Sequence, residues 1–217
     1  MVSPPGICGP VPVPFPAPEF FLWPADKPVH RVHSDRFGAA DFNGTANGNA
    51  RFSPIRHDGK IIPTIYGGST LTCAMMETIF HDLPHGIFPR TVHLKSVVGL
   101  QYSTIVPTSP LKLVDLSVIS LHRYHIDRGN LIDTEKSQYP LTRLWAEAFY
   151  AQCKDCQGLR WISRRDDGAE AIVLFGDRIL AGTLQQLVDT SSIDIINDVK
   201  IRNELARLAL RLGVLLV

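Results

Sequence analysis

The amino-acid sequence predicts an α+β fold organised as a single domain. Segments rich in β-branched and aromatic residues occur among segments of helical periodicity, with no internal repeat and no sign of a second domain. The chain has 217 residues, which is long enough to bury a sizeable core. Hydrophobic residues make up 45% and charged residues 20% of the chain, close to the globular average, so the body is not disordered.

The charge and hydropathy of the chain argue against two classes of partner. The formal net charge is +1, which gives no electrostatic reason to expect nucleic acid or an anionic membrane as the main partner. No apolar run approaches the length of a transmembrane helix. The N-terminus lacks the charged start and apolar core of a secretory signal, so we expect a cytoplasmic protein.

The sequence contains four cysteines: Cys8, Cys73, Cys153 and Cys156. The last two form a C-x-x-C pair, but no second pair completes a four-cysteine zinc site. The pair also does not open a helix after a strand, as a redox pair would. We therefore expect free thiols in a reducing cytoplasm.

Residues 1–27 are predicted to form a proline-rich arm, followed by the folded body at 28–217. Half of the 16 prolines lie in residues 1–24, so this segment is neither a helix nor a central strand. We expect residues 1–18 to be a flexible tail. Residues 20–23, Phe-Phe-Leu-Trp, offer apolar side chains that can pin the end of the arm to the body.

The elements of the body follow from hydrophobic periodicity and turn residues. Strands are predicted at 28–33, 61–66, 91–106, 111–119, 158–163 and 169–175. Helices are predicted at 70–80, from Pro140 onward, at 183–189 and after Asp198; Ser69 or Thr70 can cap the first and Asp198 the last. A loop rich in Gly and Asn joins the first two strands, and a solvated polar turn at 164–168, including Arg164 and Arg165, joins the last two.

Two of the predicted helices have a clear apolar face. The helix that begins at Pro140 carries a predicted core stripe of Leu141, Leu144, Trp145, Ala148, Phe149 and Gln152. The C-terminal helix carries Val199, Ile201, Leu205, Leu208 and Leu212 at helical spacing. We interpret the stripe of residues 141–149 as core rather than as a cofactor-binding surface.

Glu77 is the most unusual residue of the chain, because it lies on a helix that is apolar on nearly all sides. One apolar stripe of this helix consists of Leu71, Ala74, Met75 and Ile79, and a second, on which Glu77 lies, of Cys73, Met76 and Phe80. Such a helix is usually buried. A buried carboxylate must be paired, protonated or used in chemistry.

Four polar residues at or near strand ends are candidates to face Glu77: Arg31, Arg51, Tyr66 and Ser163. Arginine is suited to grip a phosphate or a carboxylate bidentately. A tyrosine offers an aromatic face to a flat ring, and a strand-end serine can donate or accept a hydrogen bond.

The segments around these residues form an ordered pattern. It consists of His30-Arg31-Val32, Asn49-Ala-Arg51-Phe-Ser-Pro54, Thr64-Ile-Tyr66-Gly-Gly-Ser, Cys73-Ala-Met-Met-Glu77 and Gly158-Leu-Arg-Trp-Ile-Ser163. Over residues 28–178 the chain resembles the RES domain, a family named for an Arg, a Glu and a Ser.

The resemblance implies a compact fold with central, mostly antiparallel sheets and flanking helices, similar to ADP-ribosyltransferases of the diphtheria-toxin type. RES toxins of bacterial Xre–RES toxin–antitoxin pairs consume NAD+ by breaking the nicotinamide–ribose bond, by hydrolysis or phosphorolysis, and some are linked to ADP-ribosylation of a protein. An Xre-like antitoxin with a helix-turn-helix domain blocks their active site. By position, Arg31, Glu77 and Ser163 match the named triad, and Arg51 and Tyr66 match further pocket residues.

The chemistry of that bond suits these residues. Its cleavage builds positive charge on the ribose ring, which a fixed carboxylate such as Glu77 stabilises, more strongly in a dry pocket. The resemblance assigns the diphosphate to Arg31 and Arg51, the nicotinamide ring to Tyr66, and either the nicotinamide ribose or the orientation of Glu77 to Ser163. No metal is needed, because nicotinamide leaves as a neutral group.

Two other interpretations stay open on the sequence alone. Glu77 can form a structural ion pair with Arg31 or Arg51 in a non-catalytic interaction protein of the same fold. The eight histidines allow a weaker alternative, a metal-dependent hydrolase, since His81 and His85 are four residues apart. The sequence also leaves open whether water, phosphate or a protein accepts the ADP-ribose, and whether the protein forms a homo-oligomer.

Overall fold

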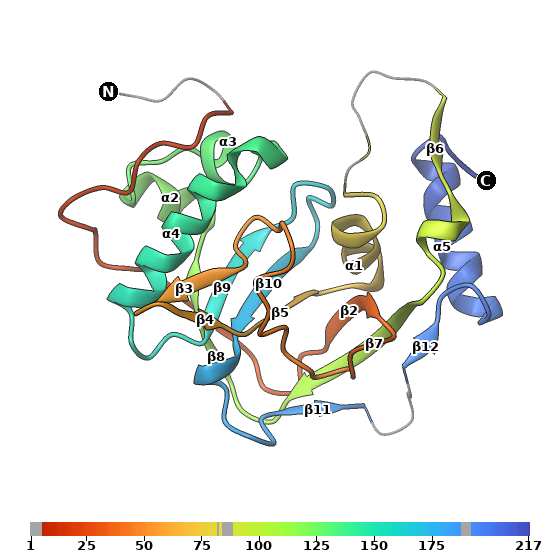
Figure 1. Ribbon diagram of the computed structural model, residues 1–217, viewed down its shortest axis with the longest axis horizontal. Coiled ribbons are helices and arrows are strands. Elements are labelled where there is room, and N and C mark those ends of the chain that lie inside the picture. The colour runs from red at the N-terminus through yellow and green to blue at the C-terminus, as the bar shows by residue number, and fades with distance from the viewer. Residues whose placement is uncertain (1–5, 82, 84–88, 188–191) are drawn as a thin grey trace.

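The computed structural model describes residues 6–81, 83, 89–187 and 192–217 (Figure 1). Its centre is a nine-stranded sheet in the order β1-β8-β9-β10-β5-β2-β7-β11, with β12 also pairing with β7. The strands are β1 Phe20–Trp23, β2 Val29–Ser34, β5 Thr64–Gly68, β7 Leu100–Pro107, β8 Leu111–Asp115, β9 Gly158–Ile162, β10 Glu170–Phe175, β11 Leu184–Gln186 and β12 Ile193–Asp194. All neighbours pair antiparallel except β8 and β9, which are parallel.

Two small sheets and five α-helices surround this sheet in the described residues. The strand β3 (Ile55–His57) pairs antiparallel with β4 (Lys60–Ile62), and β6 (Arg90–Val92) pairs in parallel with β13 (Val214–Leu216). The helices are α1 Leu71–Thr78, α2 Val118–Arg123, α3 Arg128–Leu131, α4 Tyr139–Gln152 and α5 Val199–Arg211, with short 3₁₀ helices η1 Leu94–Ser96, η2 Lys136–Gln138 and η3 Gly176–Arg178. The predicted α+β class, with mostly antiparallel sheets and flanking helices, is confirmed.

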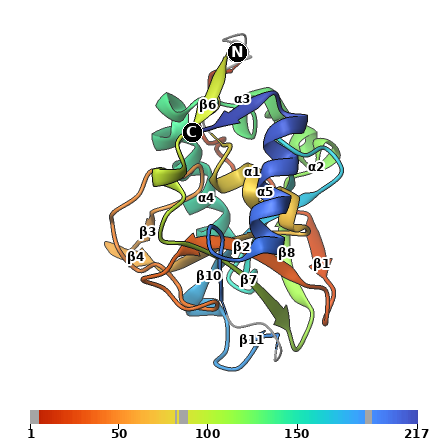
Figure 2. The ribbon, with the colours of Figure 1, turned by 90° about the vertical axis from the view of Figure 1, so that its right-hand side faces the viewer.

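The helices form two groups, α2–α4 on one side and α1 with α5 on the other (Figures 1 and 2). The first group packs on β9 and β10 through a core that contains Trp145 and Phe149. In the second group, Met75 of α1 and Leu205 of α5 are both fully buried in a separate core. The candidate site described below lies between these two groups.

The strand β10 carries the core on both of its faces, because successive side chains of a strand point to opposite sides. Val173 packs into the core under α4, whereas Ile172 and Leu174 pack into a third core that contains Trp23 and Ile105. A sheet buried on both faces holds its strand ends rigidly, which suits a site built from them.

The helix predicted at 70–80 is α1, and its capping residue is the predicted Thr70. The Thr70 Oγ1 accepts a hydrogen bond from the backbone N–H of Cys73 at 3.0 Å. The apolar side chains at 73–76 are buried. Glu77 itself is half-buried rather than enclosed, because its side chain lies at the wall of a pocket.

The N-terminal arm is extended, as predicted, but the expectation of a flexible tail is wrong for residues 6–18. Cys8 is 4% exposed, and Phe15 packs its ring edge-on against Phe149 at 5.0 Å between centroids. The Trp145 Nε1 donates a hydrogen bond to the Gly9 carbonyl at 2.9 Å. The prediction that residues 20–23 pin the arm is confirmed, since they form β1 at the edge of the large sheet.

The predicted core stripe of the helix after Pro140 is half wrong. Trp145 and Phe149 are buried, but Leu141 is 39% exposed and Leu144 is 50% exposed. The buried face is rotated because Thr142 lies in the core, where its hydroxyl donates to the backbone carbonyl of Arg51. A satisfied polar group can therefore take a core position that hydropathy alone gives to leucine.

Several predicted boundaries also change. Pro63 divides the strand predicted at 61–66 into β4 and β5, and the segment 91–106 contains β6, η1 and β7. The strand predicted at 111–119 ends at Asp115, and α2 follows it. The short helix predicted at 183–189 is wrong for residues 184–186, which form β11, while 188 and 189 lie outside the described residues. The C-terminal helix is confirmed, with Asp198 as its cap.

All four cysteines are free and buried, in agreement with the prediction of free thiols. Burial raises the pKa of Cys8 to about 11 and the pKa values of Cys73 and Cys156 to about 12, so these thiols are protonated at neutral pH. Within the described part of the chain, no helix has the length and hydrophobicity needed to cross a membrane.

We expect Phe15→Ala to lower the free energy of unfolding by about 1–3 kcal/mol, because it removes a ring packed on Trp145 and Phe149. Urea denaturation measures this change. Val13→Ala is the control: Val13 is 95% exposed, so its loss should stay within about 0.5 kcal/mol. Equal stability of both variants and the wild type, with fast labelling of Cys8 by a thiol reagent in the native protein, would contradict the packed arm.

Candidate active site

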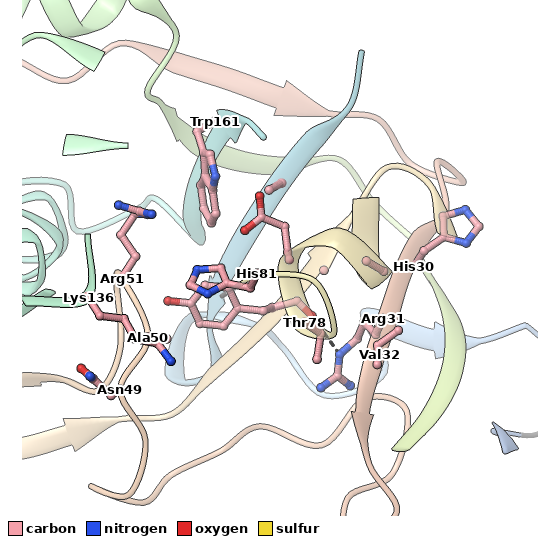
Figure 3. Close-up of a pocket in the computed structure, with 15 residues that line it drawn as sticks. His30, Arg31, Val32, Asn49, Ala50, Arg51, Thr78, His81, Lys136 and Trp161 are labelled. Carbon is pink, nitrogen blue, oxygen red and sulfur yellow. Dashed lines mark hydrogen bonds between the residues drawn. The ribbon is translucent and has the colours of Figure 1, made fainter. Parts of the chain in front are cut away.

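A cavity of about 280 Å³ lies between α1 and the α2–α4 group. Its lining comes from six parts of the chain: β2, the turn before β3, β5, α1 with the residues after it, η2, and the paired strands β9 and β10. The residues that line it are His30, Arg31, Val32, Asn49, Ala50, Arg51, Tyr66, Gly67, Ala74, Glu77, Thr78, His81, Lys136, Trp161 and Ala171 (Figure 3). Four of the five predicted site residues are among them, and the fifth, Ser163, lies directly behind Glu77.

Two glycines at the end of β5 bring the site residues close together. A Cβ atom at Gly67 would lie 2.3 Å from Val29 Cγ1, and one at Gly68 would lie 2.7 Å from Cys73 Sγ. No larger residue fits at either position unless β2 or α1 shifts. The Gly-Gly pair therefore allows β2, which carries Arg31, and α1, which carries Glu77, to pack directly on β5.

Glu77 is held by a hydrogen bond to Ser163 and not by an arginine. The Ser163 Oγ donates to Glu77 Oε1 at 2.6 Å. Among the described residues, neither Arg31 nor Arg51 forms a salt bridge with Glu77, and Glu77 Oε2 accepts no hydrogen bond. The interpretation of Glu77 as half of a structural ion pair is therefore wrong.

Ser163 is fully buried and follows the last residue of β9. Its hydroxyl oxygen accepts hydrogen bonds from the backbone N–H groups of Arg165 and Asp166, both at 3.1 Å. Its own proton is then directed to Glu77. Because Ser163 does not line the cavity, the geometry favours the second of its two predicted roles, the orientation of Glu77.

Arg31 is 6% exposed and is fixed by backbone carbonyl groups. Its Nε donates to the Tyr66 carbonyl at 3.0 Å, and its Nη1 donates to the Ala39 carbonyl. Burial lowers the pKa of Arg31 to about 10, against the opposing attraction of Asp41. The guanidinium is therefore still charged at neutral pH.

Arg51 is also 6% exposed and has the same kind of support. Its Nη1 donates to the carbonyls of Leu131 and Thr134, both at 3.2 Å, and to Thr134 Oγ1 at 2.6 Å. Its Cζ lies 5.0 Å from the ring centroid of Tyr139. Burial lowers the pKa of Arg51 from its usual range, and the nearby Tyr139 opposes this.

The two guanidinium groups make the cavity attractive to an anion. Carbonyl oxygens satisfy their hydrogen bonds but do not neutralise them, and neither Arg31 nor Arg51 has a salt bridge within the described chain. A charge removed from water and left without a counterion is costly. Figure 3 shows Arg51 and Arg31 on opposite sides of the cavity, where a bound anion would offset this cost.

Comparison with known families agrees with this arrangement. A sequence profile of the RES domain matches residues 28–193. The chain belongs to the RES domain family. Arg31, Glu77 and Ser163, which the sequence pattern matches to the three residue types of the family name, lie at one place in the fold.

One similar solved structure is the crystal structure of the M. tuberculosis MbcT–MbcA toxin–antitoxin complex. The similarity has a TM-score of 0.54 at 16% sequence identity and covers 81% of this chain and 86% of that chain. At this identity the likeness shows a shared fold. No curated protein matches the chain with significant sequence similarity.

Tyr66 of this RES domain is held at both ends. Its hydroxyl accepts a hydrogen bond from the backbone N–H of Phe52 at 3.0 Å, and its carbonyl accepts from Arg31. Burial raises its pKa above the usual range, so the phenol is neutral. Its ring meets Trp161 edge-on at 6.3 Å between centroids, and both rings line the cavity.

The cavity residues that were not predicted as site residues include His81, Lys136 and Trp161. Trp161 lies in the quoted RES pattern but was not singled out. His81 lies three residues beyond the end of α1 and lines the same cavity as Glu77; its Nε2 is 2.8 Å from the Tyr139 hydroxyl. In the sequence prediction His81 appears only as one half of the His81/His85 pair of the metal alternative. Nothing in the local sequence marks Lys136.

The turn after Ser163 was predicted to be solvated, but its two arginines contact the protein. Arg164 Nη1 donates to the carbonyls of Asp133 at 3.0 Å and Thr134 at 2.7 Å. Arg165 Nη2 donates to the His81 carbonyl at 2.9 Å. These arginines tie the turn to both helix groups and so support the site from its outer side.

The described residues contain no group of three or more His, Cys, Asp or Glu side chains that could hold a metal ion. His85, which was paired with His81 in the metal alternative, lies outside the described residues.

We expect Ser163→Ala to lower the free energy of unfolding by about 1–3 kcal/mol, because two partly buried backbone N–H groups and Glu77 Oε1 lose their partner. Urea denaturation measures the loss. Ser96→Ala is the control, since Ser96 is an exposed serine whose hydroxyl also makes one backbone hydrogen bond. A loss no larger than that of Ser96→Ala would show that the Ser163 hydroxyl does not organise the site.

Proposed function

We propose that this RES domain protein consumes NAD+ by breaking the bond between nicotinamide and ribose, and that it is the toxin of a toxin–antitoxin pair. The observation that carries the proposal is a single cavity in which Glu77 is kept apart from two buried guanidinium groups. Membership in the RES family supports it, and the similar fold of a toxin from a toxin–antitoxin complex agrees with it.

The chemistry of the cavity fits the parts of NAD+. The guanidinium groups of Arg31 and Arg51 attract the diphosphate, and the rings of Tyr66 and Trp161 offer flat surfaces for nicotinamide. The cavity volume, about 280 Å³, lies just below the range of typical ligand sites, which is roughly 300–1,000 Å³. We therefore propose that it takes the nicotinamide riboside and diphosphate, with the adenosine at its mouth.

In the proposed reaction the bond between ribose C1′ and the nicotinamide nitrogen breaks. The bonding electron pair leaves with nicotinamide, which becomes neutral, and positive charge develops on the ribose ring. The Glu77 carboxylate, held at Oε1 by Ser163, stabilises this charge through its other oxygen. Water, phosphate or a protein side chain then forms a bond to C1′ and loses its proton.

The family resemblance extends the proposal to partners and location. We propose an Xre-like antitoxin with a helix-turn-helix domain that covers the mouth of the cavity, and a cytoplasmic site of action. Similarity to ADP-ribosyltransferases is the basis for keeping a protein acceptor of ADP-ribose among the possible products. A homo-oligomer is compatible with this mechanism, which needs residues of one chain only.

No contact favours the two alternatives over this proposal. A non-catalytic protein would have no need to keep Glu77 apart from Arg31 and Arg51, at the cost of leaving charges unpaired. The metal-dependent hydrolase depends on histidine ligands, but His81 Nε2 already has the Tyr139 hydroxyl as a partner.

We expect purified protein to release nicotinamide from NAD+, and Glu77→Gln to reduce kcat by at least about 100-fold while the fold is retained. Chromatography of nicotinamide, with and without phosphate, measures the rate and identifies the acceptor, and circular dichroism checks the fold. A chelator should leave the rate unchanged.

Glu204→Gln provides the control, because Glu204 lies on the exposed side of α5 and pairs only with Arg207 among the described residues. Its activity should equal that of the wild type. If the wild type releases no nicotinamide and transfers no ADP-ribose to any protein of a lysate, the proposed function is wrong. Full activity of Glu77→Gln would equally contradict the role of the carboxylate.

A further inference from the structure

The two arginines of the cavity present unequal sets of donors to a diphosphate. Arg31 has already committed Nε and Nη1 to backbone carbonyls, and Arg51 has committed Nη1 to three acceptors. Arg31 therefore presents Nη2 rather than a complete fork. Arg51 keeps Nε and Nη2, and its Nη2 lies 3.5 Å from the Tyr139 hydroxyl. A diphosphate carries four non-bridging oxygens, and a third cation in the cavity would strengthen its binding.

Lys136 is placed to be that donor. It lines the same cavity and lies on the Arg51 side, facing Arg31 across the space between them (Figure 3). Unlike the two arginines, it is exposed at the rim rather than buried. A lysine ammonium on a long flexible stem can meet a phosphate that enters the mouth of a cavity.

The turn that carries Lys136 is fixed on two sides, which makes its position more than incidental. On the cavity side, Arg51 and Arg164 both donate to the Thr134 carbonyl, at 3.2 Å and 2.7 Å. On the outer side, the backbone N–H of Cys8 donates to Gln138 Oε1 at 3.2 Å. Contacts at the Thr134 carbonyl and at the Gln138 side chain thus hold the segment that carries Lys136 between the site and the N-terminal arm.

We infer that Lys136 is a specificity residue, which contacts the diphosphate of the substrate and gives the enzyme its preference for dinucleotides over nicotinamide riboside, which has no phosphate. This inference rests on the proposed function. It adds a third cation to the two arginines. It also places the diphosphate of the substrate next to η2, at the rim of the cavity.

The test compares kcat/KM for NAD+ and for nicotinamide riboside in the wild type and in Lys136→Ala. With NAD+, kcat/KM should fall about tenfold, the change expected for one charge-assisted contact, and almost entirely through KM. With nicotinamide riboside it should not change. Lys136→Arg should restore most of the loss, and the KM of Lys136→Ala should depend less steeply on salt.

Lys154→Ala is the matched control, because Lys154 is an exposed lysine outside the cavity. It should behave as the wild type with both substrates. An equal loss of kcat/KM on both substrates in Lys136→Ala would assign Lys136 a structural role and overturn the inference. No loss on either substrate would overturn it as well.

A second measurement separates this inference from the proposed function. ADP-ribose should raise the thermal midpoint of the wild type, and the apparent affinity from this shift should be about tenfold weaker in Lys136→Ala. Equal affinities overturn the role of Lys136 whether or not NAD+ is cleaved. If the wild type binds ADP-ribose but releases no nicotinamide, the proposed reaction is wrong. The affinities of the wild type and Lys136→Ala for ADP-ribose still test whether Lys136 contacts the diphosphate.

Discussion

The site depends on a separation of charge: one carboxylate and two guanidinium groups line the same cavity without neutralising one another. Glu77 is held by the hydroxyl of Ser163, and Arg31 and Arg51 are held by backbone carbonyls. A direct ion pair between Glu77 and one of the arginines would lower the free-energy cost of burying these charges. It would also cancel the electrostatic field that the groups present to a ligand in the cavity. The neutral hydrogen-bond partners fix each group in place and keep its charge available. This arrangement is what electrostatic catalysis needs, since groups that are already oriented do not have to reorganise during the reaction.

The ends of the chain brace the two sides of this arrangement. The family profile covers residues 28–193, so both the N-terminal arm and α5 lie outside it. The arm packs on α4 and η2, which support the Arg51 side of the cavity. The helix α5 shares a core with α1, which carries Glu77, and Arg90 Nη2 donates to the Leu212 carbonyl at 2.6 Å to hold the end of α5. Sequence beyond the family core thus contributes to the rigidity of the site, in addition to the stability of the fold.

The sequence predicted those parts of the site that depend on local signals or on an ordered pattern. The apolar run around Glu77 and the cap at Thr70 located α1, and the RES pattern supplied the other predicted site residues. What the sequence did not predict depends on long-range contacts. The high proline content of the arm predicted a flexible tail. It carries no information about long-range contacts such as the hydrogen bond from Trp145 Nε1 to the Gly9 carbonyl, which holds the arm on α4. Hydropathy predicted Leu144 in the core because it contains no information about hydrogen-bond partners. In the structure Thr142 takes the buried position, where its hydroxyl donates to the Arg51 carbonyl. Lys136 entered the cavity through tertiary placement of η2, for which no local motif exists.

The measurement that tests the central claim most directly is the affinity of the protein for ADP-ribose, which has the diphosphate but no nicotinamide to release. Titration calorimetry on the wild type, Arg31→Met, Arg51→Met and Arg207→Met compares the two cavity arginines with one that is 72% exposed on α5. If unpaired buried guanidinium groups form the anion site, each cavity variant should bind about tenfold or more weakly, and Arg207→Met should bind as the wild type does. Equal affinity in all four folded proteins, or no binding by the wild type, would contradict the account.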